Sequence, residues 1–180
     1  MSVVMKFGGT SVADAEAIGR LAAIVRRQIA RQGPGGKPPI VVVSALSKVT
    51  DGLLEAARLI ENGDRDRATS RLNDLVERHV AVATGVTSAA RRAALTRDLR
   101  AEFAATSDMV RALAALHEVS PRLLDVVAAT GELASSRLVA AALAESGIPA
   151  AWIDAREVIV TDGEYTAAVP DMTATCARAR

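Results

Sequence analysis

Cysteine, aromatic residues and unbalanced charge are all scarce in this sequence. Cys176 is the only cysteine among 180 residues, which excludes an internal disulfide framework and is typical of a reducing compartment. The two Phe, one Tyr and one Trp are too few for a platform on which nucleic-acid bases could stack. The 22 Lys and Arg nearly balance the 21 Asp and Glu, so no overall electric field favours nucleic acid or an anionic membrane. We therefore expect neither partner.

Long hydrophobic runs and metal-ligand patterns are lacking as well. Only a few apolar residues precede Gly8, too few for a signal peptide, and no uninterrupted apolar stretch approaches the length of a membrane span. No Cys and His spacing is typical of a zinc site, so we predict no metal ligands in the chain. Half of the residues are hydrophobic, which allows a sizeable core. These features predict a globular, cytoplasmic protein.

The most informative feature that is present lies near the N-terminus, where an apolar run leads through Lys6 and two glycines into a helical pattern. Residues 3–5 predict a buried strand, and Gly8 and Gly9 permit a tight turn whose N–H groups can converge on one anion. The positive end of the following helix and the charge of Lys6 would add to that attraction. The turn predicts a phosphate site, although such turns also serve merely to make a sharp bend.

The order of elements predicts an α/β fold. A first helix carries apolar residues at helical spacing up to Ile29, and a Gly- and Pro-rich loop follows at 32–39. The four apolar residues of 40–43 predict a strand buried on both faces, as in a parallel sheet covered by helices. Strand-helix-strand order then predicts a right-handed βαβ unit. Thr50 is a suitable N-cap for the next helix.

A long charged stretch at 64–118 predicts a helical insertion, divided near Gly85 and Val86. Apolar residues at helical spacing mark one buried face in each part, and the charged residues between them predict solvated faces. The expected buried positions are Leu72, Leu75, Val76 and His79 in the first part, and Leu95, Leu99, Phe103, Val110 and Leu113 in the second.

The last third of the chain predicts two helices, two short strands and the start of a third helix. A helix opening at Ser120 is expected to end at 130–132, before another helix begins. Residues 150–153 and 158–160 have strand-like apolar runs. Residues 171–180 resemble the first turns of a helix with no following strand. We therefore expect the chain to stop inside a fold, with apolar sheet surface left exposed.

Two further segments carry candidate substrate-binding groups. Ser44 and Thr50 follow the second strand, at the edge where open parallel sheets bind ligands. Their hydroxyls can bind a polar substrate, although Ser44 can equally end the strand and Thr50 cap the next helix. Glu132 can bind an ammonium group, since a glutamate is ionised at pH 7. The alternative is a surface glutamate near a helix N-terminus, where a negative charge is favourable.

Other polar residues are assigned structural roles. His79 and His117 lie at helical spacing from apolar neighbours, so we expect packed or surface histidines and not ligands or bases. Cys176 has no paired base in view and is expected to be inert. Two pairs are expected to form ion pairs that position the loops around Glu132: Arg122 with Asp125, and Asp154 with Arg156.

The string Lys6-Phe7-Gly8-Gly9-Thr10-Ser11 resembles the opening signature of aspartate kinases, members of the amino-acid kinase family. It differs from the P-loop, whose lysine follows the glycines. Three later segments are similar to the family in the expected order: Val43-Ser44-Ala45 followed by Thr50, Gly131-Glu132, and Trp152-Ile153-Asp154. The resemblance implies the three-layer amino-acid kinase fold, a mostly parallel sheet flanked by helices. Residues 1–180 would be its N-terminal, amino-acid-binding part, without the nucleotide-binding half and regulatory modules.

The resemblance also implies an activity. It is phosphoryl transfer from MgATP to the side-chain carboxylate of L-aspartate, giving aspartyl phosphate for lysine, methionine and threonine biosynthesis. ATP and Mg²⁺ are the implied cofactors, with the magnesium ligands expected mainly from ATP and the missing half. No general base is needed, because the attacking carboxylate is already ionised. The implied site residues are Lys6 for catalysis, Lys6, Gly8, Gly9, Thr10 and Ser11 for the phosphates of ATP, and Ser44, Thr50 and Glu132 for aspartate, with Glu132 facing its ammonium group.

Two alternatives of other kinds stay open. A sibling amino-acid kinase would share the fold and act on another carboxylate or phosphate acceptor. A catalytically silent partial domain would bind only an anion or a partner chain. A homo-oligomer is compatible with all three.

Overall fold

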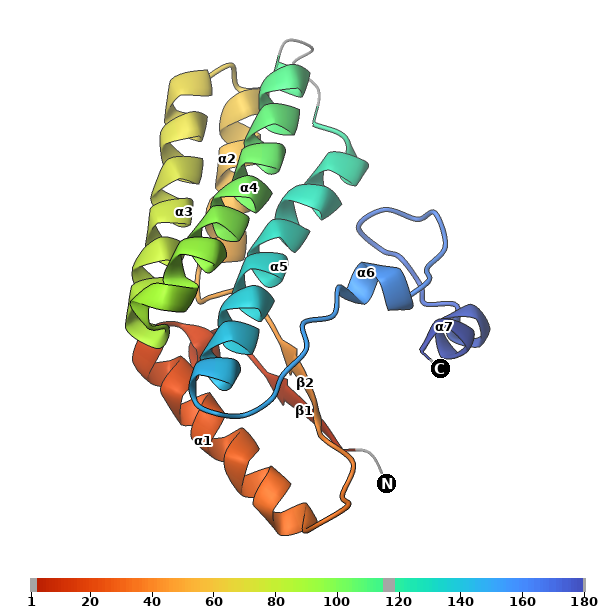
Figure 1. The fold of residues 1–180 in the computed structure, drawn as a ribbon. Coiled ribbons are helices and arrows are strands. Elements are labelled where there is room, and N and C mark those ends of the chain that lie inside the picture. The colour runs from red at the N-terminus through yellow and green to blue at the C-terminus, as the bar shows by residue number, and fades with distance from the viewer. Residues whose placement is uncertain (1–2, 115–118, 180) are drawn as a thin grey trace.

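A computed structural model describes residues 3–114 and 119–179 (Figure 1). It has the α/β composition that the sequence predicts, with most residues in helices. Its elements in chain order are β1 (Val4–Phe7), the 3-10 turn η1 (Gly9–Val12), α1 (Ala15–Gln32), β2 (Ile40–Val43), α2 (Val49–Glu61), α3 (Arg65–Val86), α4 (Ala89–Ala114), α5 (Pro121–Glu145), α6 (Ala155–Val158) and α7 (Met172–Arg178).

The two strands form a parallel pair with helices on one face only. β1 pairs with β2 so that Lys6 lies opposite Val42, and α1 connects the two strands. Side chains alternate between the faces. The inner ones pack against the helical core, whereas Val4 is 62% exposed and Ile40 55% exposed on the outer face. The predicted burial of 40–43 on both faces is therefore wrong, because helices of the described chain cover only one face.

Helices α2 to α5 lie side by side and form a bundle above the sheet (Figure 1). Leu53, Leu99 and Leu138 are fully buried between them, and α1 packs against α3 and α5. The stretch at 64–118 is helical as predicted, and α3 ends at Val86. The predicted buried positions of both parts are buried, apart from Leu113, which lies outside the described side chains.

Helix α5 is the central helix, and it differs from the prediction. Its start is as expected, since the Ser120 hydroxyl accepts a hydrogen bond from the Leu123 N–H at 3.3 Å. It then runs without a break to Glu145, so the predicted end at 130–132 is wrong. By length and composition α5 could cross a membrane, but 56% of its apolar window is buried inside the protein, as is usual for a core helix. Glu132 and Arg137 interrupt its apolar sequence.

The predicted strands after α5 do not form. Residues 150–154 have no regular structure, and 155–158 form the single helical turn α6, with the Asp154 carboxylate accepting from the Arg156 N–H at 2.9 Å. In the described residues, the pairing outside β1 and β2 is one bridge between Thr161 and Pro170. Strand-forming residues gain little without a neighbouring strand. α7 forms at the predicted place, capped by Asp171.

Candidate functional site

The opening turn follows β1 directly and carries the residues predicted to bind phosphate. Lys6 lies on the exposed outer face of β1. Gly8 is extended, and its carbonyl accepts from the Ser11 N–H at 2.9 Å, which closes η1. A Cβ added to Gly8 would meet no protein atom within 4 Å. The space beside Gly8 is therefore open. Lys6, two residues before Gly8, and Thr10, two residues after it, are both exposed.

Gly9 has a different physical reason to be glycine. A Cβ there would lie 3.0 Å from the carbonyl oxygen of Ala45 and 3.5 Å from the Cα of Ser47. The Ser47 N–H also donates to the Gly9 carbonyl at 3.2 Å. Gly9 thus lets the opening turn contact the loop that follows β2.

The helix N-terminus that was expected to strengthen the anion site is already occupied. α1 begins at Ala15, after η1, and the Asp14 carboxylate accepts from the Ala17 N–H at 2.8 Å. A negative group therefore already caps this positive helix end. The predicted contribution of α1 to anion binding is wrong, and the groups next to the glycines that suit an anion are the Lys6 ammonium and the N–H groups of η1.

The loop from Ser44 to Thr50 continues the strand pairing and then turns sharply. The Ser44 N–H donates to the Phe7 carbonyl at 3.1 Å. Lys48 is the cap residue of α2, with a left-handed backbone (φ 66°) that is uncommon outside glycine. α2 begins at Val49, so the alternative in which Thr50 caps the helix is wrong. Thr50 lies half-buried in the first turn of α2.

Glu132 is brought to these loops by the close packing of α5. A Cβ on Gly131 would lie 2.9 Å from Val49 Cγ1 and 3.0 Å from Ala45 Cβ, so α5 contacts the loop and the start of α2 through bare backbone. The Ser135 hydroxyl, one turn further on, donates to the Ser44 carbonyl at 2.7 Å. Gly131 therefore marks a helix contact and not a helix end.

The electrostatics connect Glu132 with Lys6. Partial burial raises the pKa of the Glu132 carboxyl above its ordinary value, while the Lys6 ammonium lowers that pKa by a smaller amount. The two side chains are thus close enough to influence each other, although they lie 126 residues apart in the sequence. One site offers a cation that suits an anion and a carboxylate that suits an ammonium group. The 44–50 loop contacts both the opening turn and α5, so the three segments that carry all of the predicted site residues lie together.

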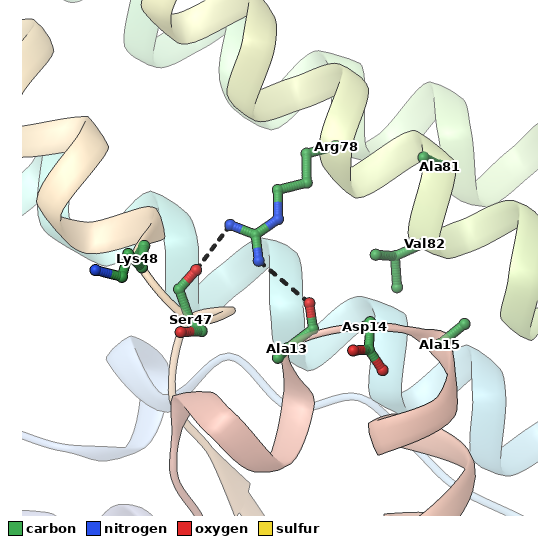
Figure 2. Close-up of a pocket in the computed structure, with 8 residues that line it drawn as sticks. All are labelled: Ala13, Asp14, Ala15, Ser47, Lys48, Arg78, Ala81 and Val82. Carbon is green, nitrogen blue, oxygen red and sulfur yellow. Dashed lines mark hydrogen bonds between the residues drawn. The ribbon is translucent and has the colours of Figure 1, made fainter.

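Two residues at this site escaped the sequence analysis. Arg78 of α3 donates to the Ser47 carbonyl at 2.7 Å and to the Ala13 carbonyl at 3.2 Å (Figure 2). The charge-rich pattern of 64–118 had placed such residues on a solvated face. The only sequence signal for Arg78 is its place between the expected buried positions Leu75 and His79, and in the structure it is half-buried. Ser135, which holds Ser44, had no distinguishing signal beyond its place in the segment after Glu132.

A hollow beside Arg78 lies on the α3 side of the two loops (Figure 2). None of the residues predicted to bind phosphate or aspartate lines it. Its lining consists of Ala13, Asp14, Ala15, Ser47, Lys48, Arg78, Ala81 and Val82. The hollow is therefore separate from the space beside Gly8 and Glu132.

The residues given structural roles behave in several ways. His79 is fully buried, with Nδ1 2.7 Å from the Leu75 carbonyl oxygen and its ring 5.0 Å from that of Phe103, so it is a packed histidine as predicted. His117 lies outside the described residues. The Asp154 and Arg156 pair forms at 2.6 Å, which holds the pKa of the Asp154 carboxyl below its usual value. Cys176 is free and exposed.

The predicted pair of Arg122 with Asp125 is replaced by other contacts. The Asp125 carboxylate accepts from the Thr166 N–H at 2.8 Å. The Arg122 guanidinium lies 5.9 Å from the centre of the Tyr165 ring. Both residues therefore connect the loop before α7 to α5 instead of pairing with each other.

Comparisons with known proteins identify the family. The sequence profile of the amino acid kinase family matches residues 1–177. The chain belongs to the amino acid kinase family. It is 32% identical to lysine-sensitive aspartokinase 3 of Escherichia coli over 172 aligned residues, and this alignment covers 96% of this chain and 35% of that protein. It is 32% identical over 157 residues to a chloroplastic bifunctional aspartokinase/homoserine dehydrogenase 1 of Arabidopsis thaliana, covering 87% of this chain and 16% of that protein.

A solved structure of the family supports the same fold. The crystal structure of E. coli aspartokinase III in complex with aspartate and ADP superposes with a TM-score of 0.82 and 30% identity, over 99% of this chain and 37% of that one. The predicted amino-acid kinase fold is confirmed. The chain spans about a third of the length of these bacterial relatives and a smaller part of the plant enzyme.

Proposed function

We propose that the protein is an aspartate kinase that transfers the γ-phosphoryl group of MgATP to the side-chain carboxylate of L-aspartate. The observation that carries the proposal is the packing of the 44–50 loop against both the opening turn and α5, which brings Lys6 and Glu132 within electrostatic reach of each other. A phosphoryl-transfer site for an amino acid needs a cation for phosphate oxygens and an anion for the α-ammonium group. Membership of the amino acid kinase family and the similarity to aspartokinases support this assignment.

The proposed roles follow from charge and position. The Lys6 ammonium offsets the charge of the transferring phosphoryl group, and the open side of Gly8 admits a phosphate oxygen to the backbone N–H groups of the turn. Gly9, Thr10 and Ser11 complete that turn. Glu132 binds the aspartate ammonium, while the hydroxyls of Ser44 and Thr50 bind its carboxylates. The chain's part in catalysis is then to hold the acceptor carboxylate in line with the phosphorus.

Magnesium does not fit the residues of this chain alone. The ion prefers several oxygen ligands, and the described residues hold no group of three or more His, Cys, Asp or Glu that could hold a metal. ATP supplies the phosphoryl group. We place the protein in the cytoplasm, because its single cysteine and balanced charge suit that compartment.

Substrate binding is tested with Glu132→Gln in the longest form of the protein that its gene encodes. The acyl phosphate formed from MgATP and L-aspartate is trapped with hydroxylamine and measured. Losing a charge-assisted bond of roughly 1.5–3 kcal/mol should raise the KM for aspartate by about 10- to 100-fold, with the KM for ATP little altered. Protonation removes the negative charge that binds the aspartate ammonium. Because the pKa of Glu132 is raised, this loss of aspartate affinity should begin at a higher pH than it would for a fully hydrated glutamate.

Lys6→Ala is the matched comparison and should lower kcat far more than it weakens aspartate binding, since the Lys6 charge is needed most during transfer. An unchanged aspartate KM in Glu132→Gln, together with a lowered melting temperature, would make Glu132 a purely structural helix residue. Turnover of another acceptor in place of aspartate would identify a sibling kinase. An unaltered protein that neither binds nor phosphorylates any acceptor would be the silent partial domain.

A further inference from the structure

Arg78 joins the two loops of the site from a helix that contributes no predicted ligand. Its side chain extends from α3 between the loops, and its two terminal nitrogens donate to different segments (Figure 2). One acceptor is the Ser47 carbonyl, inside the Ser44–Thr50 loop. The other is the Ala13 carbonyl, directly after η1. A planar guanidinium can hold two such acceptors at a fixed separation.

The acceptors are main-chain carbonyls, so Arg78 acts on loop position and not on side-chain chemistry. Ser47 is also the residue whose N–H donates to Gly9. At Ser47 the 44–50 loop is therefore held from two sides, by the opening turn at 8–12 and by α3. The left-handed backbone of Lys48 follows immediately. Such backbone persists only where the surroundings enforce it.

We propose that Arg78 is a positioning residue that sets the separation between the phosphate turn at 8–12 and the aspartate loop at 44–50. The effect of Arg78 on catalysis rests on the proposed function. The clamp itself, meaning the two hydrogen bonds by which Arg78 joins the turn to the loop, is a property of this chain. With Arg78 in place, the acceptor carboxylate and the phosphoryl group are held at reacting distance. Without it, each loop keeps its own ligands while their relative position varies. A small misplacement of reacting groups is costly in rate.

The first experiment follows backbone hydrogen exchange in the 180-residue chain. In Arg78→Met, the Ser47 amide, which donates to Gly9, should exchange about tenfold faster or more, because local opening is no longer opposed from α3. Buried amides in the middle of α2 and α5 should keep their rates. Arg78→Lys retains the charge and part of the bonding, so it should restore part of the protection at Ser47.

Arg71→Met is the matched control. Arg71 lies on the same helix and pairs with Glu55 of α2 at 2.9 Å, so it also joins α3 to α2 but does not bind either loop carbonyl. This variant should leave Ser47 exchange unchanged. If hydrogen exchange became faster by the same factor at Ser47 and in the helices, and did so in both variants, Arg78 would have only a general structural role and the proposal would be overturned. Unchanged Ser47 exchange in a folded Arg78→Met protein would overturn it as well.

The second experiment measures aspartate phosphorylation in the longest encoded form. Arg78→Met should lower kcat by at least about tenfold and more than it raises either KM, and Arg78→Lys should recover part of that loss. A normal kcat in Arg78→Met would refute the positioning role. If the unaltered protein does not phosphorylate aspartate, the proposed function fails, while the Ser47 exchange still decides whether the clamp exists.

Discussion

At the scale of single residues, His79 combines complete burial with a titratable ring. Burial lowers the pKa of the His79 imidazole below its ordinary 6.5, the nearby Arg78 charge lowers it further, and the hydrogen bond to the Leu75 carbonyl opposes both. The unfolded chain therefore binds the proton more readily than the folded one. The stability that neutral His79 contributes is complete above the unfolded pKa and is lost as pH falls below it.

We expect the free energy of unfolding to decrease between about pH 7.5 and about pH 5.5, and to decrease less in His79→Gln. Chemical denaturation at both pH values measures this difference, and comparing the two proteins removes the contribution of other titrating groups. His117→Gln, which replaces the only other histidine, is the control. A pH dependence that disappears in the His117 variant and persists in the His79 variant would show that His79 is not the titrating group.

At the scale of elements, the crossing of α5 over the start of α2 depends on Gly131. Glycine inside a helix normally costs about 1 kcal/mol relative to alanine. Here a Cβ would lie 2.9 Å from Val49 Cγ1, closer than atoms can pack without movement, and 3.0 Å from Ala45 Cβ, which is an unusually tight contact. We expect Gly131→Ala to reduce the unfolding free energy by about 1–3 kcal/mol in spite of its better helix propensity, because it overpacks this contact.

Gly19→Ala in α1 is the matched control for that measurement. A Cβ on Gly19 would meet nothing within 4 Å, so the same substitution should stabilise the protein by about 0.5–1 kcal/mol. Thermal unfolding of both variants gives the two signs directly. A stabilised Gly131→Ala protein would mean that α5 can shift without cost, and the close contact would lose its importance for placing Glu132.

The same contact explains which parts of the fold could be predicted from the sequence. Periodicity identified the buried faces of α3 and α4, because those patterns are local. A glycine at a helix crossing has the same sequence signature as a helix end, so Gly131 was misassigned. Likewise, Lys48 replaced Thr50 as the cap of α2, since the loop is fixed from outside by Arg78 and Gly9. The resemblance to aspartate kinases predicted that the three site segments belong to one site. It gave no signal for Arg78, because the acceptors of that side chain are backbone carbonyls, which any sequence provides.

At the scale of the whole molecule, the outer sheet face is an exposed apolar surface. Val4, Ile40 and Val42 are 62%, 55% and 42% exposed on neighbouring positions of the two strands. Exposed apolar side chains gathered on one face favour association, whereas scattered ones do not. Their place beside Lys6 means that whatever covers this face also lies next to the phosphate turn.

We expect the 180-residue chain to self-associate reversibly, and the double variant Ile40→Thr and Val42→Thr to shift it toward monomer. Threonine keeps a β-branched shape that suits a strand while it lowers the apolar area. Sedimentation velocity over a range of concentrations measures the shift. Ile29→Thr is the control, because Ile29 is 38% exposed on α1, away from this face. If the control dissociates the chain as well as the double variant does, or if the unaltered chain is monomeric throughout, the outer face does not drive association, and Lys6 stays accessible to ligand in the isolated chain.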